Sequence, residues 1–381
     1  MPGLVGGFGK ITKYSFSYYI FSKKFYFLIN KNFNYFFKFK LNKLNLITKN
    51  YNTITKLNEN NTIYNSTINN YNINYSNLGP YLAGLIEGDG TIAIHDPNNQ
   101  NNKYNPKIII IFKKSDLKLA TFLQIITKSG IILNKPERGY ILWQIQDIES
   151  IYNIINLING YIRTPKIEAV HRTIDWLNNY ILKNKNSHLI ITQKILSKIT
   201  ILEKKPLDFS SIDSNSWFSG FSDADGNFSI NIHKRTNRNS TRVQLFYRLE
   251  IRQNYHRLDS ANNNLNYFNI MSKIGLFLGV TVYSRSRIIK DKIFYSFIIM
   301  THNKISNLKV CEYFYNFPLL SSKYLDYKDW KDILELQNNN LNTTSYLDKA
   351  INMRKDFNST RTTYVWNHLN NCYFFVKRNK E

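Results

Sequence analysis

Two segments of this 381-residue chain share one pattern, and this duplication constrains the fold more than any other feature. Each segment is an apolar stretch that ends in Asp-Gly and is followed by alternating apolar and polar residues. The segments are residues 82–90, followed by 91–95, and residues 218–226, followed by 227–233. A single Asp-Gly usually marks a turn. Two of them in the same setting predict an internal repeat, in which a helix leads directly into a strand.

The same order of expected elements follows each segment. In the first copy we expect helices at 81–90, 117–126, 147–157 and 166–182, and strands at 91–95, 107–114, 131–134 and 139–145. In the second copy we expect helices at 216–226, 264–275, 303–313 and 323–337, and strands at 227–233, 243–253, 278–289 and 292–300, with a basic loop at 234–242. The pattern predicts an α+β protein made of two pseudo-symmetric αββαββα repeats with two antiparallel sheets.

Four regions follow from this repeat. Residues 78–205 form repeat 1 and residues 206–340 form repeat 2. Residues 1–77 are expected to be a disordered or proteolytically removed extension, because residues 14–40 are aromatic and basic and residues 58–77 are Asn-rich with little periodicity. A helix on a membrane surface remains an alternative for residues 14–40. Residues 341–381 form a basic C-terminal extension.

The net charge limits the partners of the chain. With 51 Lys and Arg against 26 Asp and Glu, the formal charge is +25, which predicts attraction to DNA, RNA or an acidic membrane surface. No run of about 18 apolar residues is present, so we expect no transmembrane segment. Two cysteines, Cys311 and Cys372, are too few for a disulfide scaffold.

Small residues on the two segments predict that their helices pack closely. They lie four positions apart, on one face of each helix: Gly84 and Gly88, and Gly220 and Ala224. Close packing would bring Asp89 and Asp225 together at the helix C-termini, where the helix macrodipole is already negative. Two adjacent carboxylates repel each other, and divalent cations commonly compensate such pairs.

Both segments resemble the LAGLIDADG motif of homing endonucleases and group I intron maturases, in the form that carries two motifs in one chain. The resemblance covers about residues 78–340; the first copy departs mildly at Glu87 and Gly88, and the second is more divergent but keeps residues 223–226. It implies a saddle of two four-stranded sheets in adjacent major grooves, and a monomer. It also implies that Asp89 and Asp225, with Gly88 and Ala224 before them, bind divalent metal such as Mg²⁺.

Further positions carry over from the family one at a time. The family usually has a lysine after each second sheet pair, which Lys166 and Lys323 match. A Gln or Lys near the end of the second strand supports active-site water; Gln253 matches this position, and Lys114 is its nearest equivalent in repeat 1. The resemblance implies that these residues hold water and stabilise charge near the scissile phosphate.

Strand alternation predicts which residues face DNA. Candidates for contact with base edges are His95, Ser229, Asn231, His233, Arg248, Arg285 and Arg287. Candidates for contact with phosphates are Lys234, Arg235 and Arg242.

The implied function is metal-dependent phosphodiester hydrolysis by a site-specific endonuclease that cuts double-stranded DNA at an intronless allele. The alternative is a maturase that binds its own group I intron RNA and assists splicing, alone or in addition. Residues 1–9 resemble a segment of cytochrome c oxidase subunit 1, as expected for an upstream exon read into an intron. With the AT-rich codon bias seen in 53 Asn residues, this predicts an intron-encoded protein of the mitochondrial matrix.

Overall fold

The computed structural model describes residues 71–94, 105–235, 240–258, 263–338 and 343–377. Residues 66–381 belong to one compact unit of the chain. The exon-like residues 1–9 and the aromatic segment 14–40 lie outside the described residues. Within the described residues, no helix is long and apolar enough to cross a membrane.

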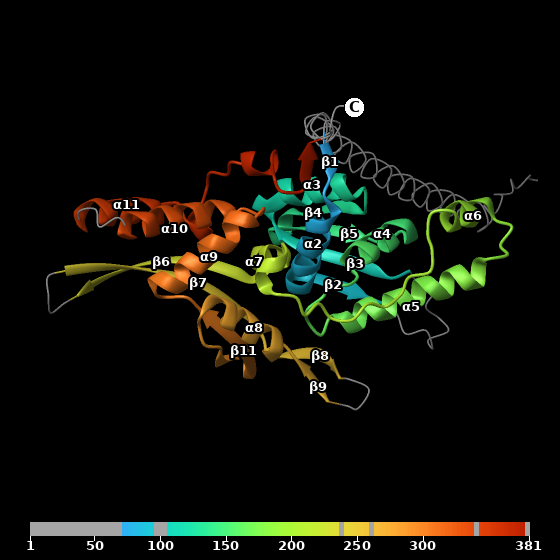
Figure 1. Ribbon diagram of the computed structural model, residues 1–381, viewed down its shortest axis with the longest axis horizontal. Coiled ribbons are helices and arrows are strands. Elements are labelled where there is room, and N and C mark those ends of the chain that lie inside the picture. The colour runs from blue at the N-terminus through green and yellow to red at the C-terminus, as the bar shows by residue number, and fades with distance from the viewer. Residues whose placement is uncertain (1–70, 95–104, 236–239, 259–262, 339–342, 378–381) are drawn as a thin grey trace, which may run out of the picture. The chain divides into compact units, whose positions relative to one another are not determined.

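Repeat 1 consists of two units, each a helix followed by two strands, and three further helices (Figure 1). Its helices are α2 (Tyr75–Asp89), α3 (Leu117–Thr127), α4 (Ile148–Ile158), α5 (Ile167–Asn184) and α6 (Ile190–Leu196), and its strands are β2 (Gly90–Ala93), β3 (Lys107–Lys113), β4 (Ile131–Lys135) and β5 (Tyr140–Ile145).

Repeat 2 follows the same order with one insertion. Its helices are α7 (Trp217–Asp225), α8 (Phe268–Leu278), α9 (Lys304–Asn316) and α10 (Lys323–Asn338), and its strands are β6 (Gly226–Arg235), β7 (Ser240–Arg252), β10 (Tyr283–Ile289) and β11 (Lys292–Met300). The insertion is a small hairpin of β8 (Asn254–Leu258) and β9 (Asn264–Asn266) between β7 and α8.

The two repeats have equivalent sheets. The strand orders are β2-β3-β5-β4 and β6-β7-β11-β10, so the first strand is at one edge and the fourth lies between the second and third in both. All neighbouring strands in these sheets are antiparallel. The predicted α+β fold with two pseudo-symmetric repeats is therefore confirmed.

Strand register makes the two repeats comparable residue by residue. Gly90 opens β2 opposite Ile110, and Gly226 opens β6 opposite Leu249. Ile110 and Leu249 are thus equivalent, and four residues further along lie Lys114 and Gln253. The sequence-based pairing of these two residues agrees with the register.

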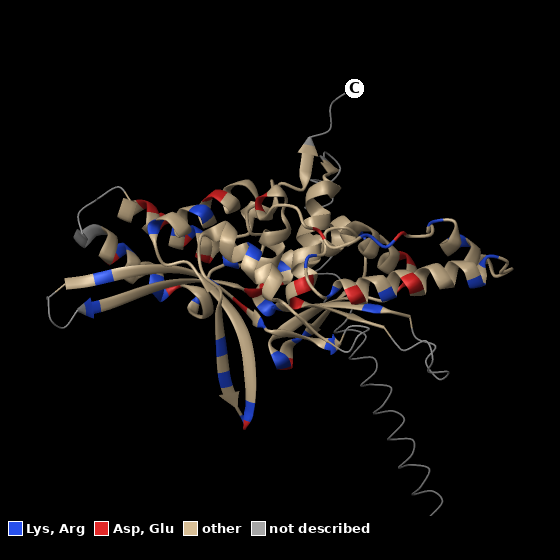
Figure 2. Ribbon diagram, turned by 60° about the horizontal axis from the view of Figure 1, so that its bottom comes forward, with Lys and Arg blue, Asp and Glu red and all other residues tan. Residues whose placement is uncertain are grey.

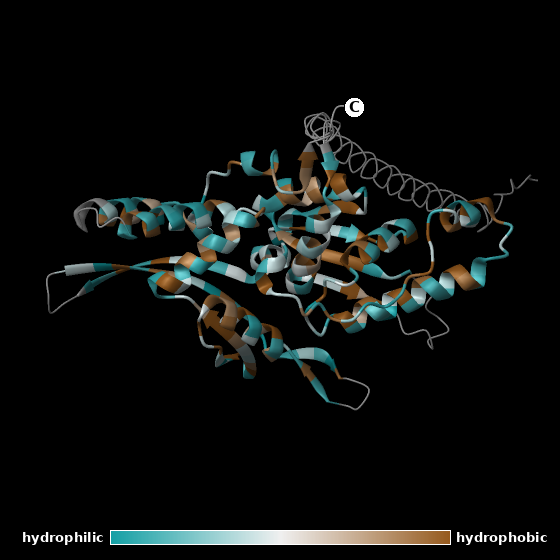
Figure 3. Ribbon diagram, in the orientation of Figure 1, coloured by the Kyte–Doolittle hydropathy of each residue, from teal (hydrophilic) through white to brown (hydrophobic). Residues whose placement is uncertain are grey.

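Each repeat buries one face of its sheet against helices. In β3 the buried residues alternate with accessible ones, and the same alternation runs along β7. The core of repeat 1 centres on Phe122 and Trp143, whereas repeat 2 packs an aromatic cluster that includes Phe218, Phe228 and Trp330. Figure 3 shows hydrophobic residues concentrated along the central strands and the helices that cover them.

Three predicted boundaries were wrong in repeat 2, and one of them is the strand expected at 278–289, which begins at Tyr283 because α8 continues to Leu278. The expected loop at 234–242 is mostly strand, because β6 and β7 continue as a long hairpin in which His233 pairs with Arg242 and Arg235 with Ser240. The helix expected at 264–275 begins at Phe268, because residues 264–266 pair with β8. At residues 233–234 and 240–242 the side chains on both faces are polar and none is buried, so no alternation of apolar and polar residues marked this part of the hairpin as strand.

The two terminal extensions of the sequence analysis also differ from the structure. Residues 71–77 were assigned to the N-terminal extension, yet Tyr71–Ile73 form β1 and α2 begins at Tyr75. Strand β1 pairs with β12 (Phe375–Lys377) near the end of the chain. The segment between α10 and β12 includes α11 (Thr343–Lys355), which packs against α10, β6 and β7.

The C-terminal segment ties the repeats together. Arg361 pairs with Asp326 at 2.9 Å and also contacts Asp329, both on α10. Further along, Phe374 is fully buried against Tyr81 of α2 and Phe122 of α3. Residues 343–377, which the sequence analysis assigned to a basic C-terminal extension, thus form part of the folded unit.

Candidate active site

Helices α2 and α7 pack with their backbones in direct contact. A Cβ added to Gly84 would lie 2.0 Å from the carbonyl oxygen of Trp217, and one added to Gly220 would lie 1.9 Å from that of Tyr81. Neither position can hold a side chain without moving a backbone. The close approach that the small residues predicted is therefore confirmed, and it is symmetric between the repeats.

This packing brings the C-terminal ends of the two helices together. A Cβ on Gly88 would lie 2.2 Å from Cβ of Ala224 and 3.0 Å from Oδ2 of Asp225. Asp89 is the last residue of α2 and Asp225 the last of α7. The two acidic residues therefore end adjacent helices, as the sequence predicted.

The environment raises the pKa of both carboxyls. The pKa of Asp89 is about 7, first because the protein around the helix end removes part of its water and second because Asp225 carries the same charge, although the residue stays exposed; Lys323 and Lys166 oppose the rise. Burial likewise raises the pKa of Asp225, and the same two lysines again oppose it. Both carboxylates thus lie where a cation would stabilise their charged forms.

Two half-buried lysines occupy the ends of the motif helices. Nζ of Lys166 donates to the carbonyl oxygens of Ile86 (2.9 Å), Gly88 (3.3 Å) and Gly90 (2.7 Å). Nζ of Lys323 donates to those of Ser222 (3.2 Å) and Ala224 (2.6 Å). Each ammonium satisfies free carbonyls at a helix C-terminus and offsets the macrodipole there.

Burial lowers the pKa of Lys166 to about 8, against the opposing pull of Glu87 and Asp225. The pKa of Lys323 is lowered by the same cause. The structure thus places both predicted lysines beside the predicted aspartates.

An acidic residue two positions before each aspartate holds the loop that carries each lysine. Glu87 accepts from the backbone amides of Arg163 (3.0 Å) and Thr164 (2.6 Å). In repeat 2, Asp223 accepts from the amides of Leu320 (2.8 Å) and Ser321 (3.2 Å). Sequence reasoning treated position 87 as a mild departure and missed this role. The signal available was the acidic residue at the same place in both segments.

The same acids cross to the opposite helix. Nε1 of Trp217 donates to Oε2 of Glu87 at 2.5 Å, and the hydroxyl of Tyr81 donates to Oδ2 of Asp223 at 2.8 Å. Each acid therefore joins its own helix, the lysine loop of its own repeat and the motif helix of the other repeat.

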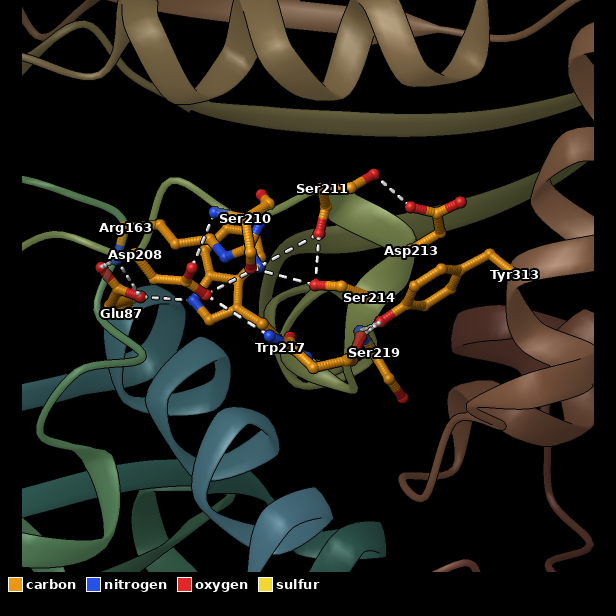
Figure 4. A network of polar contacts seen from close by, with 11 residues as sticks. Glu87, Arg163, Asp208, Ser210, Ser211, Asp213, Ser214, Trp217, Ser219 and Tyr313 are labelled. Carbon is orange, nitrogen blue, oxygen red and sulfur yellow. Dashed lines mark hydrogen bonds and ion pairs between the residues drawn. The ribbon is translucent and has the colours of Figure 1, made fainter.

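Around Glu87 the contacts extend into the segment between the repeats (Figure 4). The Arg163 guanidinium pairs with Asp208 at 2.7 Å, donates to the Ser210 carbonyl at 3.0 Å and lies over the Trp217 ring, 5.3 Å from its centroid. Arg163 and the side chains around it thus fix the loop that leads to Lys166.

The residues at the ends of the second strands lie differently from the prediction. Gln253 donates to Oγ of Ser284 (2.6 Å) and to the carbonyl of Ser296 (3.3 Å), and Lys114 is exposed. Each of these strands does supply a cation that opposes the rise in the pKa of an aspartate, but it is one residue earlier. Lys113 acts on Asp89 and Arg252 acts on Asp225. These two were missed, because the family resemblance directed attention to the following position.

Most predicted DNA contacts of repeat 2 share one face of its sheet. Paired residues lie on the same face, and the pairs place these together: Ser229, Asn231, His233, Arg242, Arg248, Arg285 and Arg287. Lys234 pairs with Thr241 and lies on the opposite face. His95 and the side chain of Arg235 lie outside the described residues. Figure 2 shows Lys and Arg spread along the strands of the long hairpins.

The side chains present fit a magnesium ion that is completed by a substrate. Within the described ranges, no group of three or more His, Cys, Asp and Glu side chains could hold a metal alone. Mg²⁺ is instead commonly bound by one or two carboxylates, several waters and a substrate phosphate. Asp89 and Asp225 supply two carboxylates, and Asp89 and Lys323 line a cavity of about 200 Å³. The backbone oxygens of Gly88 and Ala224, the other predicted ligands, accept hydrogen bonds from the two lysines.

Comparison with known proteins gives the same family for both repeats. The family model described as LAGLIDADG endonuclease matches residues 82–177 and 218–334. These two ranges begin at the two segments that the sequence analysis aligned.

Two relatives cover most of the chain. It is 44% identical over 329 residues to the intron-encoded DNA endonuclease aI3 of Saccharomyces cerevisiae, covering 83% of this chain and 78% of that protein. It is 31% identical over 277 residues to an uncharacterized cox1 intron-2 protein of Schizosaccharomyces pombe, covering 72% and 71%.

Solved structures share the fold. The LAGLIDADG homing endonuclease I-GzeII in complex with its DNA target aligns with a TM-score of 0.53 at 16% identity, covering 76% of this chain and 100% of that one. The meganuclease I-SmaMI bound to uncleaveable DNA aligns with a TM-score of 0.51 at 16% identity, covering 74% and 99%. The resemblance drawn from the two segments is thereby confirmed.

Proposed function

This chain belongs to the LAGLIDADG endonuclease family, and we propose that it is a homing endonuclease that cuts both strands of a double-stranded DNA target at an intronless allele. One observation carries the proposal: Asp89 and Asp225 end two helices whose backbones are in contact. Two adjacent carboxylates at negative helix ends are unfavourable in a protein that only binds DNA. Hydrolysis would explain this pair of carboxylates, because they would hold the cations that the reaction needs.

A divalent cation such as Mg²⁺ would be held by Asp89 and Asp225, with the carbonyl oxygens of Gly88 and Ala224 as further candidate ligands, and would activate water and neutralise phosphate charge. The chain's own residues do the rest. The ammonium groups of Lys166 and Lys323 place positive charge beside the aspartates, where charge develops on the scissile phosphate. Glu87 and Asp223 are positioning residues, since they hold the loops of these lysines. One aspartate from each repeat allows each strand to be cut.

The relatives support the proposed setting. One bears the name of an intron-encoded DNA endonuclease, and another the name of a cox1 intron protein. With the oxidase-like residues 1–9, these names support an origin in a mitochondrial group I intron and action in the matrix. A monomer suffices, because one chain carries both aspartates.

The test is cleavage of an intronless cytochrome oxidase subunit 1 gene segment that spans the codons for Gly-Gly-Phe-Gly. The full chain with Mg²⁺ should make staggered cuts in both strands near that junction, and the double variant Asp89→Asn/Asp225→Asn should make none. Absence of cutting together with tight binding of the intron RNA would replace this proposal with the maturase alternative.

A further inference from the structure

The solvent faces of the two sheets differ along their second strands. These faces are the sides of the sheets turned away from the buried cores, and in repeat 2 this face carries residues proposed to contact DNA. In β3 the accessible residues are Lys107, Ile109, Ile111 and Lys113. In β7 the corresponding accessible residues are polar or charged over the half that pairs with β11.

Register aligns the two faces position by position. Because Ile110 is equivalent to Leu249, Ile109 stands where repeat 2 has Arg248, and Ile111 stands where it has Glu250. One repeat thus has branched aliphatic side chains where the other has a charged pair.

The apolar positions of repeat 1 form a continuous patch across three strands. Ile109 pairs with Gln144, which pairs with Ile131; Ile111 pairs with Leu142, which pairs with Leu133. Ile111 is 47% exposed and Ile131 46% exposed. The next row, Lys113, Tyr140 and Lys135, bounds the patch with positive charge.

The equivalent part of repeat 2 is an arginine cluster organised by one carboxylate, and the same face also carries Tyr283, Phe294 and Met300, which are 58%, 50% and 36% exposed. Glu250 lies 2.5 Å from Arg287, 3.5 Å from Arg285 and 3.8 Å from Arg248, and it accepts from Oγ of Ser296 at 2.8 Å. The Glu250 side chain is 10% exposed, whereas the three arginine side chains are 42–48% exposed. Glu250 therefore holds the guanidinium groups in place from below, while they remain accessible to a partner.

We infer that the two repeats read half-sites of different composition: repeat 1 contacts thymine methyl groups in an A·T-rich half-site, and repeat 2 donates from arginines to guanines in the other. The inference rests on the proposed function, because it takes the solvent faces of the sheets as the DNA-binding faces. In the major groove, the thymine C5-methyl is the group that apolar side chains contact. Arginine is the side chain that donates to both O6 and N7 of guanine. Lysines at the margin of the apolar patch suit the flanking phosphates.

Modified bases test each half separately. The probe is the duplex that the full chain binds most tightly from a pool with randomised central base pairs, measured by gel shift without Mg²⁺. Replacing thymine by deoxyuridine removes only the methyl group, and replacing guanine by 7-deazaguanine removes only the N7 acceptor. We expect deoxyuridine to weaken binding about three- to fourfold per contacted thymine in one half-site. We expect 7-deazaguanine to weaken it about five- to a hundredfold in the other.

Variants assign each effect to a repeat. Ile109→Ser/Ile111→Ser should bind thymine and deoxyuridine duplexes equally and keep the sensitivity to 7-deazaguanine. Arg287→Ala should bind guanine and 7-deazaguanine duplexes equally and keep the sensitivity to deoxyuridine. The matched control is Ile190→Ser/Ile191→Ser on α6, where the residues are 81% and 77% exposed and lie on no sheet; it should behave as the unmodified chain.

Equal sensitivity of both half-sites to deoxyuridine would overturn the inference, as would both variants mapping to one half-site. A change in oligomeric state of Ile109→Ser/Ile111→Ser with unchanged discrimination would show that a second copy covers the patch. The deoxyuridine result on the unmodified chain stands even if a variant fails to fold. A duplex that shows both asymmetries but is never cut with Mg²⁺ would refute the proposed function and leave this inference in place.

Discussion

The hydroxyl of Tyr81, on the first motif helix, donates a 2.8 Å hydrogen bond to Asp223 on the second. Trp217 and Glu87, at the equivalent positions of the other repeat's motif helices, make the corresponding hydrogen bond. Tyr81 remains a donor at all ordinary pH values, because burial raises the pKa of its hydroxyl well above the usual range. Side chains thus join the same two helices whose backbones touch at Gly84 and Gly220.

The contact between the helices predicts a large cost for small additions. Gly84→Ala or Gly220→Ala would force a methyl group to about 2 Å from a backbone carbonyl, so we expect destabilisation of at least about 1–3 kcal/mol. Urea unfolding measures it. Gly139→Ala is the control, since nothing lies within 4 Å of its added Cβ and only the positive φ of 70° costs energy. Equal effects at all three glycines would contradict the backbone contact.

Neutralising the aspartates should separate cleavage from binding. Asp89→Asn or Asp225→Asn should abolish double-strand cleavage and leave DNA affinity nearly unchanged, because the amide keeps the shape but loses the charge that holds a cation. Gel shift and cleavage of the same duplex measure both. Asp175→Asn, at an exposed pair with Lys204, is the control and should cut normally. Lost binding with retained nicking would refute the metal assignment.

Glu87 should make stability depend on pH. Burial raises its pKa from 4.5 to about 7, so the folded state holds the proton more tightly than the unfolded state. The contribution of neutral Glu87 to the free energy of unfolding is fully present below about pH 4.5 and is lost as the pH rises through 7. Glu87→Gln, which stays neutral, should therefore gain stability relative to the unmodified chain between these values, by up to about 3 kcal/mol. Urea midpoints at pH 4.5 and 8 test this; a constant difference would contradict it.

The C-terminal segment should contribute strongly to stability through Arg361. Its side chain is 9% exposed against Asp326 at 8%, so Arg361→Ala would leave buried carboxylates unpaired at a cost of about 3–5 kcal/mol. Lys198→Ala is the matched control, because its pair with Glu149 is 45% and 40% exposed and should cost at most about 1 kcal/mol. Thermal unfolding of both variants would show whether residues 343–377 act as part of the fold; similar small losses would show that they do not.

Binding to DNA should weaken steeply with salt. If about six to ten phosphates are contacted, affinity should fall by roughly three to five decades between 50 and 200 mM salt, because each contact releases condensed counterions. Fluorescence anisotropy across this range gives the slope. A flat response would argue against phosphate contacts by the basic faces of the sheets.

Local patterns along the chain were enough to predict the repeat, the two motif helices and the aspartates that end them. These are local patterns: a small residue at helical spacing, an Asp-Gly at the helix end and an alternating strand can be recognised without knowing what they touch. Lys166 and Lys323 could also be placed, through the resemblance to the family.

The remaining features depend on contacts between residues that are far apart in the chain. The roles of Glu87 and Asp223 depend on backbone amides more than 70 residues away, which no local pattern encodes. Residues 71–77 and 343–377 belong to the fold because β1 pairs with β12 across the length of the chain. The difference between the two sheet faces likewise emerges only from register, since alternation tells which residues share a face but only pairing across strands shows which of them form one surface.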